Sequence, residues 1–200
     1  MKHFLLPVAL LTALPISAQT LNVEAGVSIS KLQDSFTREF YSQHITTPTF
    51  GLGLQYFERK YFDLSTNVAY LRKGGHEPYA YNDASGQPRG ADFTLDYVSV
   101  NTLAEPKIPL DKHLGLFISV GPRLDFLAGH QDSNVVFHAQ PLQKTAFGLT
   151  LGGGFHYTIS RLRFTGQADY LSNSTHIYTN GTTTVYDRTI TITFSAGYRL

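Results

Sequence analysis

The histidines are the residues of this sequence whose side chains could bind a transition metal. At least one lies in each of four long polar segments, at His44, His76, His130, His138 and His176. Imidazoles that converge in space bind zinc and related metals. However, no two histidines have a close ligand spacing such as His-x-x-x-His. We therefore interpret them as solvated loop residues, and we predict no metal site and no bound cofactor.

Catalytic groups are the second kind of chemistry to consider. A serine hydrolase needs a serine beside a histidine, with an acid that orients the imidazole. His156 falls on the polar side of an alternating run, and the apolar sides of the runs described below contain no histidine. The segment Gly152-Gly153-Gly154 lacks the Lys and Ser or Thr of a phosphate-binding loop, so it indicates space and strand curvature. We expect no catalytic residues, and we do not expect an enzyme.

Charged side chains also occur within the alternating runs, on their polar side. They are Glu24, Asp63, Glu105, Arg123, Asp125, Arg163, Asp169 and Arg199. Carboxylates and guanidiniums in a narrow, poorly solvated space should pair, because an unpaired buried charge is costly. We predict that Arg163 and Arg199 pair with Glu24, with Glu105 or Asp63 as a further partner. A path for protons or ions is the alternative interpretation of the same charges.

The element that positions these residues is clearest at the end of the chain, in residues 189–200. The apolar residues Ile190, Ile192, Phe194, Ala196, Tyr198 and Leu200 alternate there with Thr, Ser, Gly and Arg. A period of two indicates a β-strand with one apolar and one polar face. The run is long enough to cross a bilayer, since a tilted strand needs about 9–11 residues for that.

Seven earlier runs alternate in the same way, at residues 21–30, 50–56, 62–70, 98–106, 114–126, 147–157 and 162–170. Four long polar connections, at residues 31–48, 73–93, 129–144 and 173–187, alternate with short turns. Long outer loops and short periplasmic turns are typical of transmembrane barrels. The sequence therefore predicts an all-β fold, an eight-stranded antiparallel up-and-down transmembrane β-barrel. In this register Leu151 faces the lipid and Thr150 faces the lumen.

A soluble secreted barrel such as a lipocalin is the alternative fold, because it also alternates, with its apolar face inward. The apolar faces of the runs lack charge, and their polar faces are rich in small residues. A soluble surface would instead be about 25–35% charged. Aromatic residues also gather at both ends of the runs, as interfacial girdles require. They are Phe50, Tyr70, Phe126, Phe147 and Tyr170 at the outer end, and Tyr56, Phe62, Tyr157 and Tyr198 at the periplasmic end.

Residues 1–18 have the features of a secretory signal peptide, and residues 19–200 form the predicted barrel domain. Lys2 is followed by an apolar stretch from Phe4 to Ile16 and by the small residues Ser17 and Ala18. The chain contains no cysteine, which excludes disulfides and a lipid-anchored cysteine. Its 16 basic and 15 acidic side chains nearly cancel, which argues against a nucleic-acid partner. The predicted location is the outer membrane, with outer-membrane lipid as a partner.

Several short stretches from Phe50 onward resemble the PorT-like outer-membrane β-barrel proteins of Gram-negative bacteria. They are residues 70–74, 115–122, 148–157 and 188–200, in the order and spacing of that family's strands. The chain departs from the family pattern at Asn101, where proline is common, and at Leu200, where a terminal Phe is common. The resemblance implies an integral outer-membrane protein, and at least one family member is linked to protein secretion. It implies no catalytic residues.

The function predicted from these features is a structural or protein-interaction role, linked to secretion or envelope organisation. Other envelope or secretion proteins would then be partners. A transport or ligand-binding barrel with a small lumen is the alternative function. A lipid-modifying outer-membrane enzyme is the third, and the lack of a histidine on the predicted lipid face argues against it.

Overall fold

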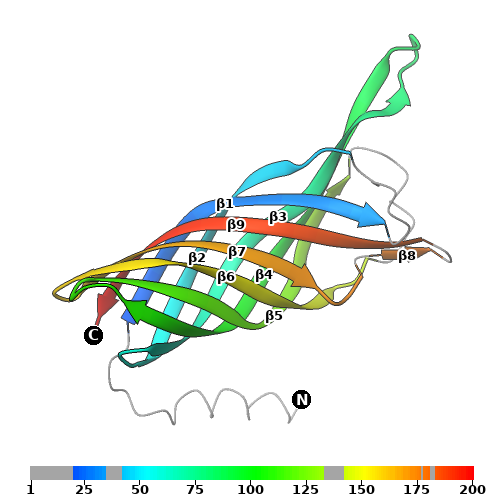
Figure 1. The fold of residues 1–200 in the computed structure, drawn as a ribbon. Helices are drawn as coiled ribbons and strands as arrows, with labels where there is room; N and C mark the ends of the chain where they lie inside the picture. Colours follow the sequence, from blue (N-terminus) through cyan, green and yellow to red (C-terminus); the bar gives the residue numbers. More distant parts are fainter. Residues whose placement is uncertain (1–19, 35–41, 133–141, 177, 181–182) are drawn as a thin grey trace.

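An antiparallel β-barrel is the architecture of the chain (Figure 1). The computed structural model describes residues 20–34, 42–132, 142–176, 178–180 and 183–200, so the predicted signal peptide at residues 1–18 lies outside the described residues. The strands are β1 (Thr20–Asp34), β2 (Ile45–Glu58), β3 (Phe62–Asn82), β4 (Pro88–Pro109), β5 (Leu114–Asp132), β6 (Thr145–Ile159), β7 (Leu162–Asn173), β8 (Tyr178–Asn180) and β9 (Thr183–Arg199). Within the described residues, no helix has the length and apolar character needed to span a membrane.

The barrel closes because its first and last long strands pair with each other. Strands β1 to β7 lie side by side in chain order, and β7 is followed by β9. Strand β9 then pairs with the whole of β1, from Thr20↔Arg199 to Asp34↔Val185. The short β8 pairs with β9 as a small hairpin outside the ring, so the ring itself has eight strands. This confirms the predicted fold class.

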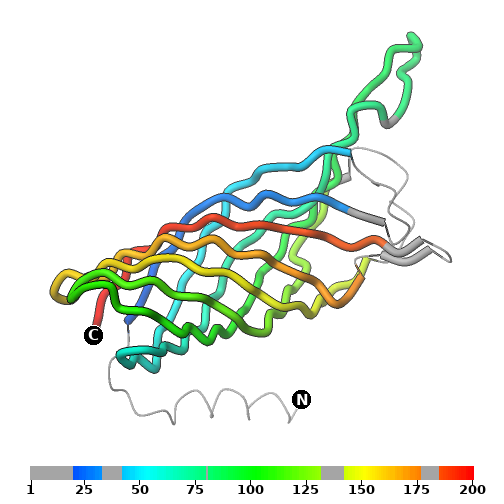
Figure 2. Tube along the Cα trace, viewed as in Figure 1, coloured from blue at the N-terminus to red at the C-terminus, as the bar shows by residue number. Residues whose placement is uncertain are grey.

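The two ends of the barrel differ in their connections. Tight turns at residues 59–61, 110–113 and 160–161 join β2 to β3, β4 to β5 and β6 to β7 at one end. The start of β1 and the C-terminus lie at this same end (Figures 1 and 2). Short turns are typical of the periplasmic end of a transmembrane barrel, so we propose that this end is periplasmic and that the opposite end is extracellular.

Along the barrel wall, apolar side chains face outward and polar side chains face inward. Leu151 is 56% exposed, whereas its neighbour Thr150 is fully buried at 0%. Buried serines, threonines and charged residues line the inside of the other strands in the same way. A soluble barrel has the opposite arrangement, and an apolar outer band is what lipid contact requires. The predicted facing of β6 is therefore confirmed.

The strands extend farther at the extracellular end than the sequence predicts. Residues 73–93 have the composition of a long loop, but β3 and β4 continue through this segment as a paired hairpin that turns at residues 83–87. This hairpin projects beyond the other strands (Figure 2). Strands β1, β2, β5 and β9 likewise extend into the segments predicted as long loops.

Above the lipid-facing band, the apolar side chains of the wall turn inward. In β4, Val98 is 39% exposed on the outer face, whereas the preceding Tyr97 is 1% exposed inside the barrel. This exchange is expected where the wall leaves the lipid and meets water, because apolar surface is then buried inside rather than outside. We call the resulting core cluster the outer plug, and it consists of Leu32, Phe93, Leu95, Tyr97 and Val185.

A β-bulge in β2 changes which residues face the lumen at the periplasmic end. The pairing of β2 with β3 shifts between Gln55 and Phe57, which makes Tyr56 the extra residue. A bulge places two residues opposite one and therefore shifts the alternation by one position. Glu58 consequently has only 13% of its side chain exposed, whereas unbroken alternation would place it on the lipid face.

Candidate functional site

The periplasmic layer of the lumen is organised around Arg163. Its Nη1 lies 3.1 Å from Asp63 Oδ2 and donates to Gln55 Oε1 at 2.9 Å. The other oxygen of Asp63 lies 2.5 Å from Lys107 Nζ, and Gln55 Nε2 donates to Glu105 Oε2 at 3.3 Å. The Arg163 and Asp63 side chains are 5% and 0% exposed. These groups therefore satisfy one another in place of water, as buried charges require.

Arg199 lies at the open edge of this layer rather than inside the lumen. Its side chain is 44% exposed, and its Nη2 lies 2.6 Å from Glu58 Oε2. Glu58 also approaches Arg163, with 3.3 Å between Oε1 and Nη1. The bulge in β2 thus supplies the carboxylate that lies between the two arginines.

The predicted pairing of Arg163 and Arg199 with Glu24 is wrong. Glu24 pairs with Ser195 in the β1–β9 register, which places it deeper in the barrel than Arg199. Of the further partners that the sequence indicates, Asp63 is confirmed for Arg163. The error arises because alternation identifies the face of a residue but not its height above the periplasmic rim.

Glu24 instead belongs to a middle layer, where it lines a cavity of about 30 Å³ together with Asp169. Asp169 accepts hydrogen bonds from Gln167 Nε2 at 2.7 Å and from Ser119 Oγ at 2.9 Å. Gly152 provides the space for this carboxylate, since a Cβ there would lie 2.0 Å from Asp169 Oδ1. A cavity of this size holds only a water or two. Side chains therefore fill this part of the lumen, as in other small barrels.

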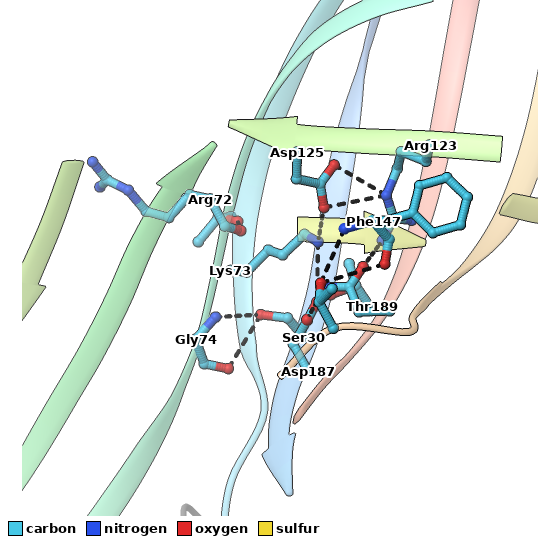
Figure 3. Close-up of polar contacts among 12 residues, drawn as sticks. Ser30, Arg72, Lys73, Gly74, Arg123, Asp125, Phe147, Asp187 and Thr189 are labelled. Atoms are coloured by element: carbon cyan, nitrogen blue, oxygen red, sulfur yellow. Dashed lines mark hydrogen bonds and ion pairs between the residues drawn. The ribbon is translucent and has the colours of Figure 1, made fainter. Parts of the chain in front are cut away.

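The outer layer of the lumen is built on Lys73, which is buried between two carboxylates (Figure 3). Its Nζ lies 2.7 Å from Asp125 Oδ2 and 3.0 Å from Asp187 Oδ2, and all three side chains are 0% exposed. Arg123 Nε lies 3.0 Å from the other oxygen of Asp125. Two cations and two carboxylates thus neutralise each other. Lys73 Nζ also lies 5.2 Å from the centroid of the Tyr97 ring, which connects this layer to the outer plug.

Sequence reasoning placed Arg123 and Asp125 in the lumen correctly but missed Lys73 and Asp187. Both missed residues fall in segments that the sequence indicates as loops. The signal that could have found them is the alternation itself. Continued a few residues past the predicted strand ends, it places Lys73 on the same face as Leu71 and Asp187 on the same face as Thr189, and all four are buried.

The predicted loop histidines do not converge on one site. His76 Nδ1 lies 2.6 Å from Asp92 Oδ1 within the projecting hairpin. His176 Nε2 lies 3.2 Å from Gln143 Nε2. Across residues 20–34, 42–132 and the later described ranges, no group of three or more His, Cys, Asp or Glu could hold a metal ion. Of the remaining histidines, His44 and His130 are exposed, and His138 lies outside the described residues.

Asp83 organises the tip of the projecting hairpin. Its Oδ1 accepts hydrogen bonds from the Ser85 hydroxyl at 2.6 Å and from the Gln87 amide at 3.0 Å. Its Oδ2 lies 2.9 Å from Arg89 Nε. The Ser85 hydroxyl and the Gln87 amide lower the pKa of Asp83 to about 2. Gly86 has a φ of 77°, a conformation that glycine adopts readily. The turn is thus held by its own side chains.

The apolar outer wall, the filled lumen and the unequal ends define an outer-membrane β-barrel. The chain belongs to the family of the outer membrane protein beta-barrel domain, whose profile matches residues 17–195. This places the protein in the outer membrane. No curated protein sequence matches the chain significantly.

Solved outer-membrane barrels have the same fold. One of them is Ail, the attachment invasion locus protein of Yersinia pestis, in complex with the heparin analogue sucrose octasulfate. Ail is 13% identical to this chain, and the TM-score is 0.51 over 91% of this chain and 99% of Ail. Neisserial surface protein A is 14% identical to this chain, and the TM-score is 0.52 over 90% of this chain and 97% of the Neisserial protein. A major outer membrane protein of Thermus thermophilus is 15% identical to this chain, and the TM-score is 0.51 over 92% of this chain and 100% of the Thermus protein.

Proposed function

We propose that this barrel is an outer-membrane anchor with a structural or protein-interaction role, and that the β3–β4 hairpin is its interaction surface. The observation that supports this most directly is the exposure of Tyr79 and Tyr81, at 76% and 45%, on the part of the chain that projects beyond the barrel (Figure 1). Tyrosine is enriched at protein interfaces, because it combines a large contact area with a polar hydroxyl. The hydrogen bonds at the Asp83 turn hold the hairpin ready for such a contact.

The partner class in this proposal is another protein of the cell envelope. The PorT-like resemblance of residues 70–74 and 115–122 supports a link to secretion or envelope organisation. In this view the barrel fixes the position of the hairpin outside the membrane, and the hairpin provides the specificity.

Transport through the lumen is less well supported. The outer plug, the buried ion pairs and the cavities of about 30 Å³ leave little room for a solute. We also propose that the chain is not an enzyme. The His156 ring lies inside the barrel, 6.2 Å from the Phe117 ring between centroids, whereas lipid hydrolysis would need a histidine on the lipid face.

Site-specific photo-crosslinking in intact cells tests the proposed interaction. A photoreactive residue in place of Tyr79 is expected to form an adduct of one defined mass with an envelope protein. The same residue in place of Gln131, which is exposed at the extracellular end of β5, is the matched control and is expected to form none.

A shortened variant tests whether the hairpin itself makes the contact. In this variant an Asn-Gly turn joins Glu77 directly to Ala91, which keeps their β-pairing and removes the projecting part. This variant is expected to fold, which heat-modifiable migration on gels would show. When it is produced together with the full chain, it is expected not to reduce the amount of adduct that the full chain forms with the crosslinked partner. Equal adducts at positions 79 and 131, or undiminished competition by the shortened variant, would contradict the proposal.

A further inference from the structure

The turn between β2 and β3, at residues 59–61, carries two cations that lie over aromatic rings. The Arg59 guanidinium carbon lies 5.1 Å from the centroid of the Phe57 ring. Lys60 Nζ lies 5.0 Å from the centroid of the Tyr61 ring. Both cations and both rings are exposed. The turn lies at the end of the barrel that carries the C-terminus, opposite the projecting hairpin (Figures 1 and 2), so the proposed protein partner does not account for it.

The carboxylates that flank this turn in the sequence balance other cations. Glu58 Oε2 lies 2.6 Å from Arg199 Nη2. Asp63 Oδ1 lies 2.5 Å from Lys107 Nζ, and it also accepts a hydrogen bond from the Arg59 backbone amide at 3.3 Å. Asp63 thus fixes the backbone of the turn, while its charge is balanced on the lumen side. The cationic groups of the turn lie over aromatic rings instead, and a ring attracts a cation without neutralising it.

An apolar strip of the outer wall begins directly beside this turn. Phe57 of β2 pairs with Leu64 of β3. Phe62, at the start of β3, pairs with Pro106 of β4, and its ring meets the Phe57 ring edge to face with 6.2 Å between centroids. Ile108, two residues beyond Pro106 on the same face of β4, is 66% exposed. The cations of the turn therefore adjoin an apolar surface at the rim of the lipid-facing wall.

We propose that this turn binds the headgroup of an anionic phospholipid in the leaflet that adjoins it. The phosphate would accept charge-assisted hydrogen bonds from the Arg59 guanidinium and the Lys60 ammonium. An acyl chain of the same molecule would lie along Phe57, Phe62 and Ile108. A soluble anion matches the cations alone, and a zwitterionic lipid brings a cationic group that Arg59 and Lys60 would repel. An anionic phospholipid matches both the cations and the apolar strip.

Lipid titration of the folded full chain in detergent micelles tests this proposal. Phosphatidylglycerol is the probe, native mass spectrometry counts the bound lipid, and the melting temperature is followed in parallel. We expect a saturable one-to-one adduct and a raised melting temperature. The double variant Arg59→Gln/Lys60→Gln is expected to weaken the apparent affinity about tenfold or more, because charge-assisted hydrogen bonds are lost. The matched control Lys112→Gln/Arg161→Gln removes as many exposed charges from the other two turns of this end and is expected to keep the wild-type affinity.

Several results would overturn the proposal. Equal adducts with zwitterionic phosphatidylcholine would mean that the negative charge is not recognised. An equal rise in melting temperature with glycerophosphoglycerol, the same headgroup without acyl chains, would mean that the turn binds a soluble anion rather than a lipid. Equal loss of affinity in the control variant would mean that only the net charge of this end matters.

A second variant keeps the proposal testable if Arg59→Gln/Lys60→Gln does not fold. Ile108→Gln removes part of the apolar strip without changing charge, and the exposed position of Ile108 makes the change compatible with the fold. We expect this variant to bind phosphatidylglycerol more weakly than the wild-type protein. Unchanged affinity would also refute the proposed site.

Discussion

Burial separates the charged residues of this barrel into those that determine stability and those that contribute little. The Arg163–Asp63 pair has exposed fractions of 5% and 0%, and the Arg199–Glu58 pair has 44% and 13%. Removing one partner of a buried pair costs about 3–5 kcal/mol when the remaining charge has no other counter-ion, and less when it has one, as Asp63 has in Lys107. An exposed pair usually contributes less than about 1 kcal/mol, because water screens it.

We predict that Arg163→Gln lowers the free energy of unfolding by about 1.5–3 kcal/mol, because charged hydrogen bonds are lost while Lys107 still neutralises Asp63. Arg199→Gln is expected to lower it by less than about 1 kcal/mol. Urea unfolding in lipid vesicles, followed by gel mobility and circular dichroism, measures both. Double-mutant cycles add a second check. The Arg163→Gln/Asp63→Asn cycle should give a clear coupling energy, and the Glu24→Gln/Arg199→Gln cycle should give none within error. Equal destabilisation by the two single changes would contradict this ranking.

The lipid-facing side chains provide a prediction that depends on depth. Leu151 lies near the middle of β6 and is 56% exposed, whereas Leu162 begins β7 at the periplasmic rim and is 47% exposed. Leu151→Arg is expected to lower the free energy of unfolding by about 2–4 kcal/mol, and Leu162→Arg by about 0–1 kcal/mol, because the cost of a cation falls toward the interface. The same urea titration compares them. A rim variant as unstable as the central one would mean that the membrane boundary lies elsewhere.

At the scale of the strands, the sequence predicted the wall correctly and the strand ends poorly. The wall is predictable because one face of each strand must meet lipid. Apolar and polar residues therefore alternate inside the bilayer, as Leu151 and Thr150 do. Beyond the bilayer the apolar residues move to the inner face, as between Tyr97 and Val98, and this exchange looks like the end of a strand. The bulge at Tyr56 has the same effect at the other end, where it hides the inward position of Glu58.

The two kinds of connection should differ in accessibility from outside the cell. Because the chain has no cysteine, one introduced cysteine is a unique label site. Ala84→Cys, at the exposed hairpin tip, is expected to react with a membrane-impermeant maleimide on intact cells. Lys112→Cys, in the exposed turn between β4 and β5, is the matched control and is expected to react only after the outer membrane is permeabilised. Labelling of position 112 on intact cells would reverse the proposed orientation.

At the scale of the whole molecule, the ring of eight strands and the contents of its lumen act together. A barrel of this size has an interior just wide enough for side chains to fill. Here the periplasmic layer, the middle layer, the outer layer and the outer plug succeed one another along the axis, and the ion pairs at Lys73 and Arg163 are each satisfied within their own layer. The lumen is therefore a structural core made of polar groups.

Planar bilayer recording tests this view of the lumen. The reconstituted wild-type protein is expected to give no resolved unitary current steps, because neither the ion pairs nor the plug leaves a continuous water path. The variant Phe93→Ala/Leu95→Ala/Tyr97→Ala removes three side chains of the plug but keeps the buried pairs of Lys73 and Arg163, so it is expected to stay closed as well. Steps from the wild-type protein would favour transport through a small lumen. Steps from the triple variant alone would mean that the apolar plug, rather than the charged layers beneath it, closes the barrel.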